Sequence, residues 1–156
     1  MKPRVYVETS LVSYLTARPC EDLVHAAYQQ VTREWWAGRG AYELYVSQFV
    51  LDEASRGDTE AAARRLATLE EIAILEATDE ATALAEELLS RGGLPLQAQV
   101  DAFHVAVATV HGMAYLLSWN CKHIANASLR SRIEAICRFV GFEPPVICTP
   151  LELVEE

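Results

Sequence analysis

Four side chains that carry oxygen atoms lie near the ends of predicted strands, where they could bind a divalent cation. Glu8 directly follows the apolar segment 5–7, and Asn120 follows another apolar segment. Glu53 and Asp101 lie on segments with helical spacing. Hard cations such as Mg²⁺ and Mn²⁺ prefer carboxylate, carbonyl and water oxygens. Phosphodiester cleavage often uses these ions to activate water and to stabilise the leaving oxygen. The four residues therefore predict a metal-dependent nuclease.

The elements that must position these residues alternate along the whole chain. Strands are expected at 5–7, 44–46, 72–75, 115–118 and 146–148, with helices between them. This alternation predicts a parallel sheet that is covered by helices on both faces. The carboxyl ends of parallel strands share one edge of the sheet, so residues far apart in the sequence can meet there. The spacing of Thr149 and Glu152 predicts a short final helix. We expect residues 1–156 to form a single domain.

Other interpretations of the same residues remain open. An acid such as Glu8 can simply cap the following helix, and Glu53 can belong to a solvated helix face. Asp101 lies on the apolar stripe of its helix, where an unpaired carboxylate would be costly. A packed or surface position is expected for both His104 and His123.

Further side chains around the predicted site are candidates for supporting roles. Thr9 and Ser10 can hydrogen-bond a metal ligand or the attacking water, and His123 is a third supporting candidate. The candidates for contact with RNA phosphates are Arg56, Lys122 and Arg130.

The charge of the chain limits the kinds of nucleic-acid protein it can be. The formal net charge of −9 argues against a protein that coats nucleic acid through a basic face. It does not exclude a nuclease, because bound cations would offset the charge of the acidic site. Eleven of the thirteen basic residues are arginines, which suit bidentate phosphate contacts. The sequence shows no signal peptide and no apolar run of membrane-spanning length, so we expect a cytoplasmic protein.

Four segments, taken in order, resemble the signature of PIN domains. They are 5–10, 50–53, 101–104 and 116–120. Residues 115–126 are similar to a subgroup of bacterial PIN proteins of the VapC toxin type. The resemblance implies an α/β/α sandwich with a parallel sheet of about five strands. It also implies an Mg²⁺- or Mn²⁺-dependent ribonuclease with an antitoxin protein as partner. Glu8, Glu53 and Asp101 would then hold metal, and Asn120 would orient the water.

Two positions depart from the family pattern. The family usually has aspartate where this chain has Glu8, which places the carboxylate about 1.5 Å further out. Its fourth acid usually falls near Asn120 or His123, and neither residue is acidic here. We therefore expect weaker binding of a second ion, which would join the site only with the substrate phosphate.

Two further functions and one interface follow from the sequence as alternatives. The changed acids fit a PIN-type module that binds RNA or a partner but barely cuts it. The predicted fold also fits an Mg²⁺-dependent phosphohydrolase of small phosphate esters. The adjacent residues Trp35 and Trp36 point about 100° apart on a helix, so both cannot enter the core. One of them is expected in an interface, either with the antitoxin or in a homodimer.

Overall fold

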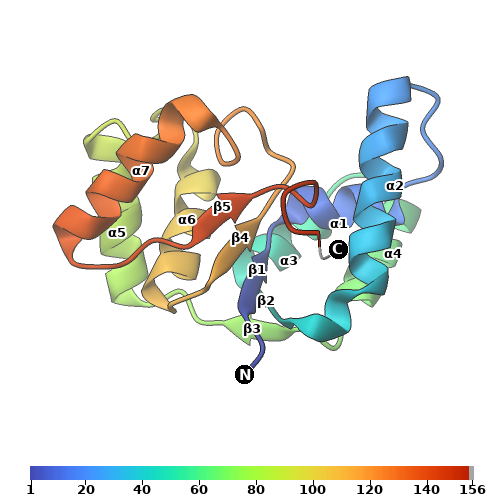
Figure 1. The fold of residues 1–156 in the computed structure, drawn as a ribbon, viewed down its shortest axis with the longest axis horizontal. Coiled ribbons are helices and arrows are strands. Elements are labelled where there is room, and N and C mark those ends of the chain that lie inside the picture. Colours follow the sequence, from blue (N-terminus) through green and yellow to red (C-terminus); the bar gives the residue numbers. More distant parts are fainter. Residues whose placement is uncertain (155–156) are drawn as a thin grey trace.

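The computed structural model describes residues 1–154 and contains a five-stranded sheet between helical layers (Figure 1). The strands are β1 (Arg4–Val7), β2 (Glu43–Ser47), β3 (Ala73–Leu75), β4 (Tyr115–Leu117) and β5 (Val146–Cys148). The α-helices are α1 (Thr9–Thr16), α2 (Leu23–Ala37), α3 (Gln48–Ala54), α4 (Thr59–Leu69), α5 (Asp79–Ser90), α6 (Gln99–Val110) and α7 (Ala127–Val140). A short 3₁₀ helix, η1 (Arg39–Ala41), precedes β2.

The sheet places β1 at its centre. The strand order is β3-β2-β1-β4-β5, and each neighbouring pair is parallel. Val5, Tyr6 and Val7 are completely buried, as is typical of a strand covered on both faces. In Figure 1, α5, α6 and α7 cover one face of the sheet, and α1, α2 and α4 cover the other. The predicted α/β/α sandwich with a parallel five-stranded sheet is confirmed.

Local signals explain where most helices begin and end, but the predicted final helix is wrong. Asp22 caps α2 by accepting a hydrogen bond from His25 N at 3.0 Å. The described residues after Thr149 form a turn, in which Glu152 N bonds to Thr149 O at 3.0 Å. Glu152 Oε2 accepts from Thr149 N at 2.8 Å, so half of the capping box is present. Leu153 packs against the core beside Trp35 and Tyr42, so the chain turns towards α2 and does not form a helix.

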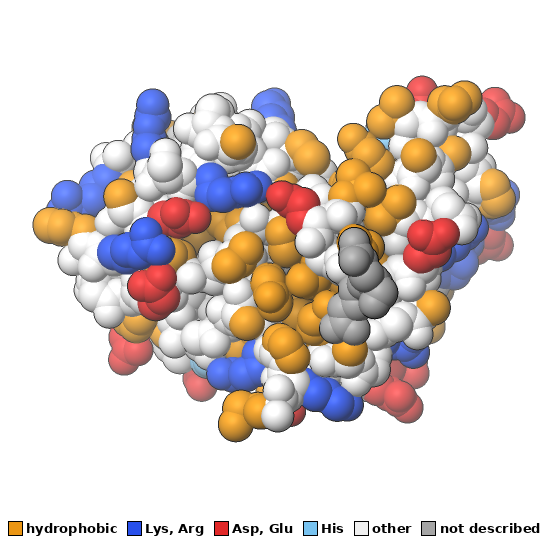
Figure 2. All heavy atoms as spheres, in the orientation of Figure 1, with side chains coloured by type: hydrophobic (Ala, Val, Ile, Leu, Met, Phe, Trp, Pro, Cys, Tyr) orange, Lys and Arg blue, Asp and Glu red, His pale blue; other side chains and the backbone are white. Residues whose placement is uncertain are grey.

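One face of the molecule shows how the charged and hydrophobic side chains are distributed. Figure 2 shows hydrophobic side chains gathered in the middle of one face, while Lys and Arg side chains are scattered around it. This face therefore has no continuous basic patch of the kind that coats nucleic acid. No helix within residues 1–154 is long and apolar enough to cross a membrane.

Candidate active site

Glu8 lies at the carboxyl end of β1 and is only 3% exposed. Its Oε2 accepts from Ser10 N at 2.7 Å, and its Oε1 accepts from the hydroxyls of Ser10 at 2.8 Å and Ser118 at 2.5 Å. Glu8 is thereby the N-cap of α1, the structural role that the sequence left open. All three donors are neutral, so within the described residues a buried carboxylate lacks an ordinary Lys or Arg partner.

Glu53 comes from α3, the helix that follows β2. Its Oε1 accepts from Thr9 Oγ1 at 2.7 Å and lies 2.6 Å from His104 Nε2. Burial raises the pKa of the Glu53 carboxyl. The hydrogen bond and charge of His104, the Thr9 hydroxyl and the charge of Arg56 together lower the pKa by more, so it lies below its ordinary value. Glu53 is therefore ionised at neutral pH.

Glu8, Glu53 and His104 form a compact group at this edge of the sheet. Their potential ligand atoms all lie within 4.8 Å of one another. The sequence predicted that Glu8 and Glu53 would meet, and the structure brings them together. His104, on α6, is completely buried, which agrees with the packed position expected for it. Its place beside the two acids was not expected.

Asp101 forms a second group, one turn before His104 on α6. Its Oδ1 accepts from Asn120 Nδ2 at 3.2 Å, and its Oδ2 lies 2.8 Å from His123 Nδ1. Asn120 Oδ1 accepts from His123 N at 3.1 Å, which holds the loop after β4. Asp101 thus has partners on both oxygens and does not belong to the compact group of Glu8 and Glu53. Its role as a metal ligand stays a prediction.

The three basic candidates differ in their relation to the acids. Arg56 is exposed, and its charge lowers the pKa of Glu53, which belongs to the compact group. Lys122 is exposed on the loop after β4. Arg130 has a buried Nε that lacks a hydrogen-bond partner within the described residues. Burial raises the pKa of the Cys148 thiol at the end of β5, and the charge of Arg130 lowers it by a smaller amount.

The acidic groups fit a divalent cation by the chemistry of their free oxygen positions. An ionised carboxylate has about four lone-pair positions. Glu8 uses three of them, and Glu53 uses two, both on Oε1. Both side chains therefore keep capacity to bind a cation through Oε2. These are hard oxygen donors of the kind that suits Mg²⁺ or Mn²⁺.

Comparison with known proteins gives the family. A family model of the PIN domain matches residues 5–120. This chain belongs to the PIN domain family. Comparison with curated proteins gave no match.

Two solved structures share the fold of this PIN domain. One is the Mycobacterium tuberculosis VapC20, described as a sarcin-ricin loop cleaving toxin. It is 22% identical with a TM-score of 0.60, and the match covers 78% of this chain and 93% of that chain. The other is VapBC2 from Rickettsia felis bound to a DNA fragment from their promoter. It is 17% identical with a TM-score of 0.58, and the match covers 94% of this chain and 98% of that chain. At these identities the likeness supports the fold alone.

Three hydroxyl-bearing residues of this PIN domain contribute to the site without having been predicted. Ser118 follows β4 in register with Glu8, because Val7 pairs with Leu117. Tyr6 Oη lies 2.7 Å from both His104 Nδ1 and Ser47 Oγ. The sequence offered a signal for Ser47 and Ser118, because each lies at the carboxyl end of a strand. Ser47 is the last residue of β2 and Ser118 follows β4, and these two strands flank β1.

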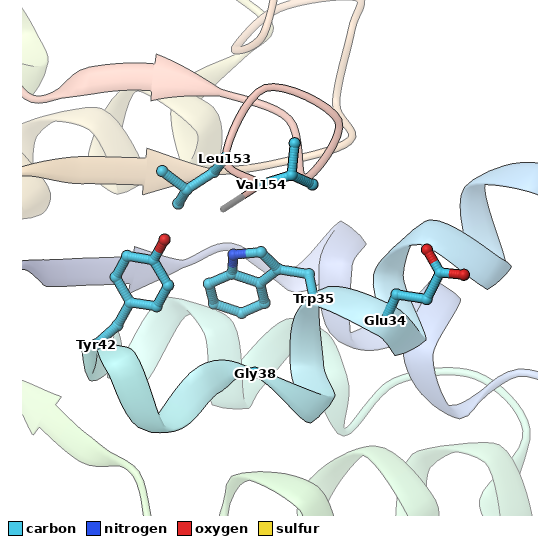
Figure 3. Close-up of a pocket in the computed structure, with 6 residues that line it drawn as sticks. All are labelled: Glu34, Trp35, Gly38, Tyr42, Leu153 and Val154. Atoms are coloured by element: carbon cyan, nitrogen blue, oxygen red, sulfur yellow. The ribbon is translucent and has the colours of Figure 1, made fainter. Parts of the chain in front are cut away.

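A separate hollow lies against α2 of this PIN domain (Figure 3). It has a volume of about 280 Å³ and is lined by Glu34, Trp35, Gly38, Tyr42, Leu153 and Val154. The residues that line the hollow include none of the acids described above. The hollow is therefore separate from the candidate active site. Trp35 is buried beside it, while Trp36 is half-buried and lies under the Arg39 guanidinium at 4.5 Å. One tryptophan of the pair thus enters the core, as predicted.

Proposed function

We propose that this protein is a metal-dependent endoribonuclease, the toxin of a toxin–antitoxin pair. It would cleave RNA phosphodiester bonds with Mg²⁺ or Mn²⁺ held by acidic side chains. The observation that carries the proposal is the meeting of Glu8 and Glu53 at one sheet edge of a PIN domain. The description of VapC20 as a toxin that cleaves the sarcin-ricin loop supports RNA as the substrate. The VapBC2 structure supports a partner protein, and an RNA substrate implies a cytoplasmic location.

The residues of the chain have distinct roles in this proposal. Glu8 and Glu53 hold the cation, with Asp101 as a further ligand. The cation, when bound, activates water and stabilises charge on the leaving oxygen. Ser10 orients Glu8 and Thr9 orients Glu53, through the hydrogen bonds that they donate.

The other candidates act around the acids. Asn120 retains one N–H and one lone pair of its amide after its bonds to Asp101 and His123, enough to orient a water. His123 supports this loop by pairing with Asp101. Arg56, Lys122 and Arg130 contact phosphates. The half-buried Trp36 belongs to an interface, with the antitoxin or in a homodimer.

Cleavage of RNA by the purified protein tests the proposal. A structured and an unstructured RNA are each incubated with the native protein and Mn²⁺, and with the native protein and EDTA. A third reaction contains Mn²⁺ and the variant Glu53→Gln. We expect fragments only from the native protein with Mn²⁺. The matched control Glu86→Gln removes the same charge from an exposed position on α5 and should cleave like the native protein. Cleavage by Glu53→Gln at the native rate would contradict the proposal.

A PIN-type binding module is the second candidate, because two observations favour it. Both oxygens of Asp101 already have protein partners, and Asn120 stands where an acid is usual in the family. Mn²⁺ binding and RNA binding without cleavage would support this candidate. Hydrolysis of short phosphate esters, with RNA left intact, would instead support the small-molecule phosphohydrolase.

A further inference from the structure

His104 connects Glu53 to a buried chain of hydrogen bonds. Its ring is completely buried, with Nε2 2.6 Å from Glu53 Oε1 and Nδ1 2.7 Å from Tyr6 Oη. Tyr6 Oη in turn lies 2.7 Å from Ser47 Oγ, and both of these residues are buried. The chain therefore runs from the end of β2, through β1 and α6, to an acid on α3.

We propose that His104 is a positioning residue, whose Nε2–H holds Glu53 Oε1 so that Oε2 alone is presented to the cation. The inference rests on the proposed function for its final step, the use of the cation in cleavage. It assigns His104 no direct bond to the metal, although its nitrogen belongs to the compact group.

The position of the proton between His104 and Glu53 follows from the partners. A ring nitrogen and a carboxylate oxygen 2.6 Å apart must share one hydrogen. A carboxylate offers only acceptor positions, and Glu53 Oε1 accepts from Thr9 Oγ1 in the same way, so the hydrogen lies on Nε2. The Tyr6 hydroxyl is both a donor and an acceptor, so it can accept from Ser47 Oγ and donate to Nδ1. A nitrogen that carries hydrogen has no lone pair for a metal.

The ring is held in this orientation by its surroundings. The Tyr6 ring meets the His104 ring edge to face at 5.7 Å, and the Phe49 ring does the same at 6.4 Å. Rotation of the imidazole would break the bonds to both Tyr6 and Glu53. An apolar residue of similar size at position 104 would fill the space but would leave Glu53 Oε1 with Thr9 as its remaining donor.

The consequence for Glu53 is a single free oxygen. Within residues 1–154, Oε1 accepts two hydrogen bonds and Oε2 accepts none. The Glu53 side chain is 30% exposed, so without these bonds it would sample several rotamers. Partners that orient a ligand in this way typically affect metal affinity by about 10- to 100-fold.

Two amide substitutions separate positioning from packing. In His104→Gln, the amide nitrogen reaches the position of Nε2 and can still donate to Glu53. In His104→Asn, the amide ends near the position of Nδ1, so it can contact Tyr6 but cannot reach Glu53. We expect the Mn²⁺ dissociation constant of His104→Gln to stay close to native and that of His104→Asn to rise about 10-fold or more. Equal losses in the two variants would overturn the inference.

Two spectroscopic measurements test the proton assignment without any cleavage. NMR of the metal-free native protein is expected to show hydrogen on Nε2 of His104, and a ring protonated at Nδ1 alone would overturn the inference. Pulsed EPR of the Mn²⁺-loaded protein is expected to show the same nitrogen couplings in the native protein and in His104→Gln. A coupling present only in the native protein would come from His104. Such a coupling would show that His104 is a metal ligand.

The outcomes keep the inference distinct from the proposed function. Native protein that binds Mn²⁺ but cuts no RNA would refute the proposed function, while the two His104 variants still decide the inference. Native protein that binds no Mn²⁺ would overturn both. If His104→Asn fails to fold, Tyr6→Phe is measured in its place, because it removes the hydroxyl that contacts Nδ1. A Mn²⁺ dissociation constant equal to that of the native protein would then overturn the inference that this chain of hydrogen bonds positions Glu53.

Discussion

The hydroxyl of Ser118 donates to Oε1 of Glu8 at 2.5 Å, across the pair of strands β1 and β4. The same Oγ accepts from Asn120 N at 2.9 Å. One serine therefore joins the buried carboxylate to the loop that carries Asn120. This bond is set by the strand register, because Glu8 N also donates to Leu117 O at 3.1 Å.

Ser118→Ala is expected to lower the free energy of unfolding by about 1–3 kcal/mol, the usual effect of removing a partner from a buried polar group. Urea denaturation of the metal-free protein measures the change. Ser90→Ala, at an exposed position on α5, is the matched control and should change stability by less than about 0.5 kcal/mol. Indistinguishable stabilities of the two variants would argue against a structural role for Ser118.

Mn²⁺ is expected to stabilise the native protein by binding to Glu8 and Glu53. At a free concentration of about 100 times the dissociation constant, a ligand specific for the folded state adds about 2.7 kcal/mol. Thermal unfolding with and without Mn²⁺ should therefore show a higher melting temperature for the native protein and for Glu86→Gln. Glu53→Gln should lose most of the shift. The assignment fails if Glu53→Gln responds to Mn²⁺ as the native protein does.

The four cysteines are free and should differ in reactivity. Burial, followed by the charge of Glu152, raises the pKa of the Cys148 thiol to about 12. Burial also raises the pKa of Cys137, whereas Cys121 is exposed. Because the thiolate is the reactive form, iodoacetamide at neutral pH should modify Cys121 and spare Cys137 and Cys148. Peptide mass spectrometry before and after unfolding checks this order, which early labelling of Cys148 would refute.

Gly93→Ala is expected to destabilise the protein by about 1–3 kcal/mol through overpacking. A Cβ at this position would lie 2.8 Å from Ile136 Cδ1 and 3.1 Å from Leu88 O. Gly40→Ala is the control, because no atom lies within 4 Å of its added Cβ. Denaturant unfolding should place Gly93→Ala clearly below both native protein and Gly40→Ala, and equal midpoints would exclude the clash.

Much of the fold could be predicted because the strands are short apolar runs separated by helices. All five strands appear where the apolar segments predicted them. The failure at Thr149 has a physical reason: capping signals act locally, but packing of Leu153 against the core decides the path of the chain there.

The candidate site could be predicted only in part. The shared edge of a parallel sheet is a property of topology, so the meeting of Glu8 and Glu53 followed from the order of the elements. Which of Asp101 and His104 faces these acids depends on the rotation of α6 about its own axis. Both residues lie on one side of that helix, and the sequence does not distinguish them. The pairing of Asp101 with His123 depends on the loop after β4, whose path local propensity does not determine.

The distribution of the compact group along the chain has a consequence for synthesis. Glu8 and Glu53 are made early, but His104 and the strand β4 that flanks β1 leave the ribosome much later. A truncated product that ends before α6 would contain both acids but would lack His104 and Ser118, two of the partners that hold them. The order of synthesis therefore delays completion of the compact group until α6 has emerged.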